Sequence, residues 1–156
     1  MVHVISSGRL RVDDGPYTQA AAAAPFEVML ARHRRSSGVA RGHLRDFLGQ
    51  VPDGAGLLDN GALVLGELVA NAVVHARVSP GREIALRLEM VHGHLRIEVH
   101  DASNEKPGIR RSTGPDDVSG RGLSLVEELS SEWGWGPRPE GIGKIVWAMV
   151  GPEGGA

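Results

Sequence analysis

The sequence contains no cysteine among its 156 residues. This absence excludes disulfides, thiolate metal sites and a cysteine nucleophile, and it fits a cytoplasmic protein. Aromatic residues are scarce, with three tryptophans, two phenylalanines and one tyrosine, so the predicted core is mainly aliphatic. The formal net charge is only -2, which gives no argument for binding to nucleic acid or to an anionic membrane surface.

No apolar run reaches the length expected of a membrane span, and the N-terminus lacks the pattern of a signal peptide. The length predicts one domain with a single core. We expect a flexible N-terminal tail over residues 1–25, the domain over 26–150 and a flexible C-terminal tail over 151–156. Glycine, at 22 residues, is abundant and gathers in loops that can approach a ligand closely.

The segment from Leu57 to Ala76 is apolar nearly all the way round, which predicts a helix buried on most sides. Asp59 or Asn60 is placed to cap its start. Three polar residues recur at steps of four along one side of it: Glu67, Asn71 and His75. This stripe fits a solvated face or a functional site, and its narrow width favours the site. An amide oxygen suits Mg2+, and a carboxylate one turn away suits a general base.

Two later segments alternate strictly between apolar and polar residues, which predicts two strands joined by a tight turn near His92-Gly93. The inward face of the second strand is formed by Leu95, Ile97 and Val99. Counting on by two places Asp101 on the same inward face, where the strand ends. A carboxylate on the core side of a strand is unusual, and the alternative is that Asp101 caps the following turn.

The remaining elements follow from similar patterns. Phe26–Arg32 suits an edge strand, and a helix is expected from Ser36 or Ser37 to about Gln50. Residues 102–120 are rich in proline, glycine and charge, and they predict a lid-like loop. A helix then begins at Gly120, with an apolar face formed by Leu123, Val126, Leu129 and Trp133. Lys144–Val150 is apolar on both faces, as expected of an interior strand in a closing hairpin.

Glycine motifs near the C-terminus suggest phosphate binding. Gly120-Arg121-Gly122 at a helix start offers free N–H groups and the positive end of the helix dipole. Taken alone this is a weak signal, because glycines often precede helices. No third glycine follows at the dinucleotide-binding spacing, and Gly143-Lys144 lacks the upstream glycine of a P-loop.

Together these motifs resemble the GHKL ATPases, the superfamily of histidine-kinase catalytic domains and gyrase-type ATPases. The segment from Glu67 to Ala76 is similar to the N box, and Asp101 with Ser103 and Pro107 resembles the first glycine box. Residues 120–126 resemble the second glycine box, and residues 143–147 resemble the closing strand motif. The combination, over residues 26 to 150, is most similar to the single-domain bacterial anti-sigma-factor serine kinases of the RsbW-like type.

The resemblance implies the Bergerat fold, an α/β two-layer sandwich with a mixed, mostly antiparallel sheet covered on one face by about three helices. It implies ATP and Mg2+ as cofactors, with Asn71 as the magnesium ligand and Glu67 as the general base. Asp101 would accept a hydrogen bond from the adenine amino group. The other cofactor-binding residues implied are His75, Ser103, Pro107, Gly120, Arg121, Gly122 and Leu123. Ile145 stands where the family usually has a threonine near an adenine-bound water, which implies weaker purine contacts.

The function implied is that of a cytoplasmic ATP-dependent protein serine/threonine kinase, which binds a sigma factor and phosphorylates an antagonist protein. A non-catalytic ATP-binding switch of the same fold is the alternative. A histidine-kinase-like ATPase domain fits less well, because no helical hairpin with a phosphoacceptor histidine is recognisable before residue 26. The resemblance also implies a homodimer formed through the exposed edge of the sheet.

Overall fold

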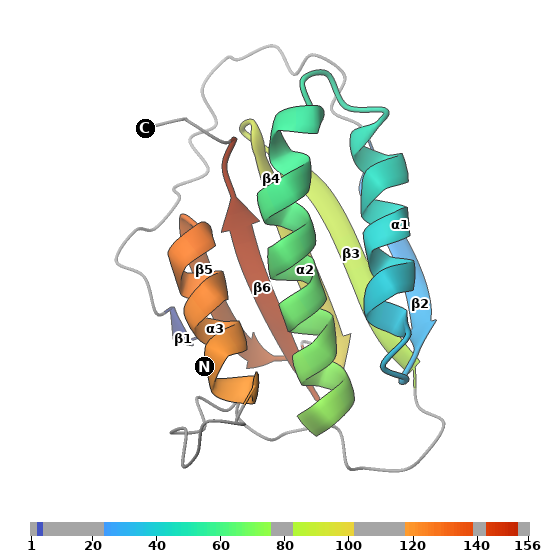
Figure 1. Cartoon of the computed structure of the whole chain (residues 1–156), viewed down its shortest axis with the longest axis vertical. Coiled ribbons are helices and arrows are strands. Elements are labelled where there is room, and N and C mark those ends of the chain that lie inside the picture. The colour runs from blue at the N-terminus through green and yellow to red at the C-terminus, as the bar shows by residue number, and fades with distance from the viewer. Residues whose placement is uncertain (1–2, 5–23, 76–82, 102–117, 139–142, 153–156) are drawn as a thin grey trace.

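A computed structural model describes residues 3–4, 24–75, 83–101, 118–138 and 143–152. They form two layers, a six-stranded sheet in the order β1-β5-β6-β4-β3-β2 and three helices that cover one of its faces (Figure 1). The predicted α/β two-layer sandwich is therefore confirmed. Each described strand pairing is antiparallel, so this part of the sheet is not mixed.

The helices and strands occur along the chain in the predicted order. The strands are β1 His3–Val4, β2 Phe26–Ala31, β3 Glu83–Val91, β4 His94–Asp101, β5 Glu132–Pro137 and β6 Lys144–Val150. The helices are α1 Ser36–Leu48, α2 Ala55–His75 and α3 Val118–Leu129. As predicted, β2 lies at the edge of the sheet and β6 lies in its interior between β5 and β4.

The hairpin between β3 and β4 turns at His92 and Gly93, as predicted. Both residues have positive φ, 49° and 80°, which is the left-handed conformation required by a two-residue hairpin loop. The loop sets the register that pairs Leu88 with Ile97 and Leu86 with Val99 on the helix-facing side. The hairpin therefore supplies the centre of the buried sheet face.

Two predictions about element boundaries are wrong. Helix α2 begins at Ala55, so Asp59 and Asn60 lie inside the helix and do not cap it. Helix α3 begins at Val118 and ends at Leu129, so Trp133 lies in β5, where its side chain is buried. In the predicted N-terminal tail, His3–Val4 pairs with β5. Most of that tail, and residues 102–117 of the predicted lid, lie outside the described residues, and the last residues of the predicted lid, 118–120, belong to α3.

Helix α2 supplies half of the buried hydrophobic residues that the described helices contribute to the core. Four of its apolar residues face the sheet and are almost completely buried: Val64, Leu65, Leu68 and Val69. By length and composition Ala55–Val73 is apolar enough to cross a membrane, contrary to our expectation from the sequence. Because these side chains pack against the sheet between α1 and α3, α2 is the central core helix of the described domain.

The sheet face opposite the helices carries a charged network. Arg96 Nε donates to Glu98 Oε1 at 2.8 Å, and His100 Nε2 lies 3.0 Å from Glu98 Oε2. The hydrogen bond from His100, together with that from Arg96, lowers the pKa of Glu98 to about 2 despite its partial burial. Arg96 also lies over the Trp147 ring, 4.7 Å from its centroid. These side chains cover the central strands on this face, where none of the described helices packs.

Candidate functional site

Four segments meet at one end of the sandwich (Figure 1). Asp101 is the last residue of β4 and Lys144 is the first residue of β6, and the antiparallel register places them opposite each other. The carboxyl end of α2, which follows Asn71, lies at the same end. Helix α3 directs its amino end there, because β5 starts with Glu132 opposite Met149, near the far end of β6. The predicted site motifs are therefore neighbours in space.

Asp101 and Lys144 form a buried ion pair. Lys144 Nζ lies 3.4 Å from Asp101 Oδ2, and the two side chains are 5% and 2% exposed, respectively. The predicted inward orientation of Asp101 is thus confirmed, and it follows from the alternation of β4. An isolated buried charge costs several kcal/mol, so each member of this pair depends on a partner of opposite charge.

Lys144 is the site residue that reasoning from sequence missed. Ile145, which we expected near the adenine, pairs with His100 and so faces the opposite side of the sheet. Lys144, one residue earlier, faces Asp101 instead. Strand alternation was the available signal, because Lys144, Val146 and Ala148 are spaced by two and are all buried.

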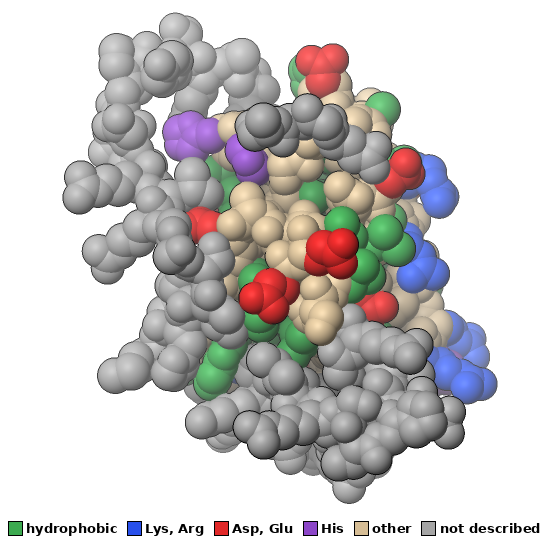
Figure 2. All heavy atoms as spheres, turned by 60° about the vertical axis from the view of Figure 1, so that its left-hand side comes forward, with side chains coloured by type: hydrophobic (Ala, Val, Ile, Leu, Met, Phe, Trp, Pro, Cys, Tyr) green, Lys and Arg blue, Asp and Glu red, His purple; other side chains and the backbone are tan. Residues whose placement is uncertain are grey.

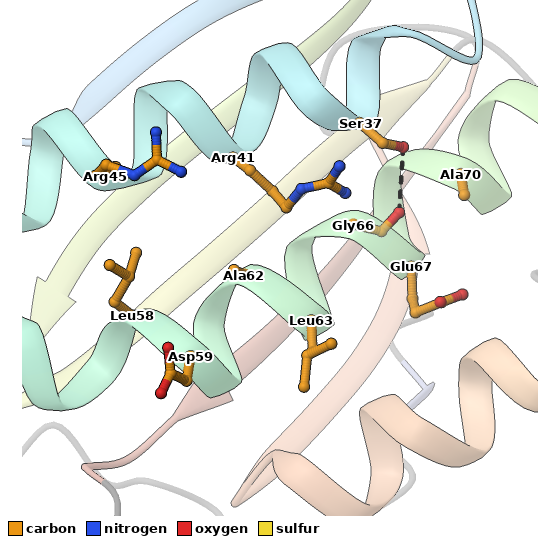
Figure 3. Close-up of a pocket in the computed structure, with 10 residues that line it drawn as sticks. All are labelled: Ser37, Arg41, Arg45, Leu58, Asp59, Ala62, Leu63, Gly66, Glu67 and Ala70. Carbon is orange, nitrogen blue, oxygen red and sulfur yellow. Dashed lines mark hydrogen bonds between the residues drawn. The ribbon is translucent and has the colours of Figure 1, made fainter.

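Glu67 and Asn71 lie one turn apart on α2, and both are partly exposed. Figure 3 shows the Glu67 side chain pointing away from α1, on the side of α2 that faces α3. Within the described part of the chain, no hydrogen bond or ion pair holds the Glu67 carboxylate. The carboxylate is therefore available to a ligand or to a reacting group.

The amide of Asn71 has an unsatisfied buried end. Its Nδ2 atom is buried and has no hydrogen-bond partner among the described residues. A half-turn of the amide exchanges its nitrogen and oxygen, so this position can offer an N–H to a phosphate oxygen or an oxygen to a metal ion. Since Mg2+ prefers oxygen ligands, the Asn71 side chain fits the predicted magnesium site.

The glycine segment lies inside helix α3. Helix α3 begins at Val118, two residues before the predicted start at Gly120, so Gly120 and Gly122 belong to its first two turns. Only the first four N–H groups of a helix lack partners within it, so Gly120 is the better placed of the two for an anion. Leu123 is 2% exposed and packs in the core. Two predicted site residues, Ser103 and Pro107, lie outside the described residues. For two others, His75 and Arg121, the structure describes the backbone but not the side chain.

A groove between α1 and α2 is a second feature that the sequence did not indicate (Figure 3). Arg41 and Arg45 line it from α1, and Leu63, which is 51% exposed, lines it from α2. A Cβ at Gly66 would lie 3.1 Å from Arg41 Nη1, so the guanidinium packs closely on α2 at this point. Glu67 also borders the groove, which therefore reaches the polar stripe of α2.

Acidic and basic side chains are unevenly distributed on this side of the molecule. In Figure 2, acidic side chains lie in the middle of the face, at its top and toward its sides, whereas the Lys or Arg side chains lie along one edge. Helix α2 contains no lysine or arginine, and α3 exposes Glu127 and Glu128. Among the described side chains, the cation nearest to the site by register is Lys144. The positive end of the α3 dipole would favour a polyanion bound here.

A long helix with a polar stripe, an inward carboxylate at a strand end and a glycine-bearing helix start converge here, which is the arrangement of an ATP-binding sandwich domain. The model of the histidine kinase-like ATPase domain matches residues 30–149, and the chain belongs to this family. ATP is therefore the ligand class of the domain.

A similar solved structure is that of the RsbU and RsbW domains of Rv1364c from Mycobacterium tuberculosis, with a TM-score of 0.61 and 18% sequence identity. The match covers 82% of this chain and 32% of that chain, so the present chain spans only a part of the other protein's length. This likeness confirms the predicted GHKL, RsbW-like fold. No curated protein matches the sequence.

Proposed function

We propose that this chain is an ATP-dependent protein serine/threonine kinase of the anti-sigma-factor type. The observation that carries the proposal is the pairing, on one helix, of an unengaged carboxylate at Glu67 with an unsatisfied amide at Asn71. Membership of the histidine kinase-like ATPase domain family supports ATP as the phosphoryl donor. In this proposal the protein acts in the cytoplasm, binds a sigma factor and phosphorylates an antagonist protein.

Each residue of the site has a distinct role in the proposed reaction. Asp101 accepts a hydrogen bond from the adenine amino group, and the amino end of α3 at Gly120 binds phosphate oxygens. Asn71 would hold Mg2+, which supplies neutralising charge for the phosphates when bound. Glu67 accepts the proton of the attacking serine or threonine hydroxyl of the partner protein. The free edge of β2 would serve a homodimer, because β2 has a neighbour on one side only in the described sheet.

The kinase proposal is tested by Glu67→Gln, which keeps the side-chain size and removes the base. Phosphate incorporation from labelled ATP into the co-purifying partner should fall by roughly 10²–10⁴, the usual contribution of a general base. ATP affinity, measured by calorimetry on the same sample, should stay within about threefold, because the proton transfer belongs to the transition state. Full transfer by a stably folded Glu67→Gln variant would reject the base role.

Asp59→Asn is the matched control for this experiment. Asp59 lies two turns earlier on α2 and borders the same groove, so its change removes one carboxylate from the same helix. It has no part in the proposed chemistry, and its transfer rate should equal that of the wild type. An equal loss in both variants would indicate an effect of charge on partner binding and not of a base.

The buried ion pair gives specific support to a second candidate function, a non-catalytic ATP-binding switch. Because Lys144 and Asp101 contact each other at the adjoining ends of β6 and β4, a nucleotide that binds to either residue also acts on the ends of both strands. A switch needs only an ATP-dependent change in affinity for its partner. ATP-dependent partner binding without any phosphate incorporation by the wild-type protein would favour this function over the kinase.

A further inference from the structure

The buried pair of Asp101 and Lys144 has a property that neither residue has alone. A carboxylate only accepts hydrogen bonds, whereas an ammonium group only donates them. Their contact at 3.4 Å places an acceptor and a donor side by side, on the helix-facing side of two adjacent strand ends. An ammonium has three N–H groups and a carboxylate has two oxygens that each accept hydrogen bonds, so both groups can hold more than one partner at a time.

The edge of adenine has the complementary arrangement. Its 6-amino group is a donor, and the neighbouring ring nitrogen N1 is an acceptor. A carboxylate alone satisfies the amino group and leaves N1 without a partner, which is costly for a polar atom withdrawn from water. Guanine presents the reverse order, with the carbonyl O6 in place of the amino group and an N–H at N1. Because the backbone fixes Asp101 on β4 and Lys144 on β6, the pair distinguishes these two edges.

We propose that Lys144 is a specificity-determining residue, which donates a hydrogen bond to N1 of adenine while Asp101 accepts one from the 6-amino group. This inference rests on the proposed ATP site and adds a second base-reading residue to it. The two residues then recognise the base as a unit, and the ion pair that neutralises Asp101 in the protein also completes the contacts of the nucleotide.

The test measures Mg2+-dependent binding of ATP and of three analogues to the wild-type protein by calorimetry. The analogues are 1-deaza-ATP, in which N1 is replaced by C–H, 7-deaza-ATP as the matched control, and GTP. Binding of 1-deaza-ATP should be weaker than that of ATP by roughly ten- to hundredfold, the usual effect of losing a hydrogen bond to a charged group. 7-Deaza-ATP should bind within about threefold of ATP, and GTP should bind more weakly than ATP.

Lys144→Met provides an independent measurement, with its folding checked by circular dichroism because the change leaves a buried carboxylate. In this variant ATP should bind as weakly as 1-deaza-ATP binds to the wild type, and the two nucleotides should no longer differ. If the variant fails to fold, the analogue series on the wild-type protein still decides the question.

Three results would overturn the role of Lys144. These are equal binding of ATP and 1-deaza-ATP by the wild type, binding of GTP as tight as that of ATP, and tighter ATP binding by Lys144→Met. The last result would mean that Lys144 only competes for Asp101. Failure of the wild type to bind ATP and all its analogues would instead overturn the proposed function itself, and the inference with it.

Discussion

Removal of the Glu98 carboxylate should change how the stability of the protein depends on pH. The pKa of Glu98 is lowered from its ordinary value of 4.5 to about 2, first by the hydrogen bond from His100 and then by that from Arg96. A lowered pKa stabilises the folded state above pH 4.5, and this contribution is lost as the pH falls toward 2. The difference corresponds to about 3 kcal/mol at neutral pH, of which about 2 kcal/mol is lost between pH 7 and pH 3.

The assay is urea unfolding of wild-type protein and of Glu98→Gln at pH 7 and pH 3. The free energy of unfolding should fall by about 2 kcal/mol less in the variant than in the wild type over this interval. Glu89→Gln is the control, because Glu89 lies on the same sheet face and pairs with Arg87 at 3.3 Å, but its side chain is 32% exposed. It should follow the wild type closely. Equal losses in the wild type and Glu98→Gln would refute the assignment of the low pKa to this network.

Two further predictions concern the site and the central helix. Asp101→Asn should weaken ATP binding at least tenfold and lower the free energy of unfolding by about 3–5 kcal/mol. Adding Lys144→Met to this variant should restore the stability but not the ATP affinity. Calorimetry and urea unfolding of the same samples measure both effects. A Cβ at Gly61 would lie 2.9 Å from the buried Leu95 Cδ2. In Gly61→Ala, overpacking should therefore lower the free energy of unfolding by about 1–3 kcal/mol, while the higher helix propensity of alanine should raise it by about 1 kcal/mol. Gly56 lies in the same helix, and a Cβ there would have nothing within 4 Å, so Gly56→Ala should be neutral or stabilising by up to about 1 kcal/mol. Equal melting temperatures of Gly61→Ala and Gly56→Ala would contradict the close contact at Gly61.

Local sequence patterns were sufficient for the elements and for much of the site. The strict alternation of β4 predicts that Asp101 faces the core, because side chains in a strand alternate between its faces. The step of four on α2 likewise predicts that Glu67 and Asn71 share one side of the helix. Helix starts were less predictable. The capping residues expected for α2 lie inside it, because the chain between α1 and α2 turns earlier, at Asp53, whose φ is 59°.

The features that the sequence did not reveal depend on contacts between distant segments. The groove beside Glu67 exists because α1 packs along α2, and Ser37 Oγ donates to Gly66 O across that contact at 3.4 Å. No periodicity within either helix encodes this contact. The contact between Asp101 and Lys144 requires the register of β4 against β6, which is set by the whole sheet.

The misplacement of Ile145 shows how much site chemistry depends on register. Successive residues of a strand face opposite sides of the sheet, so an error of one position exchanges a residue of the site for one of the opposite face. With Ile145 beside Asp101, an apolar group would weaken the purine contacts; with Lys144 there, a cation both neutralises the carboxylate and supplies a donor. The same stretch of sequence thus leads to opposite expectations for nucleotide affinity, and the pairing of β4 with β6 decides between them.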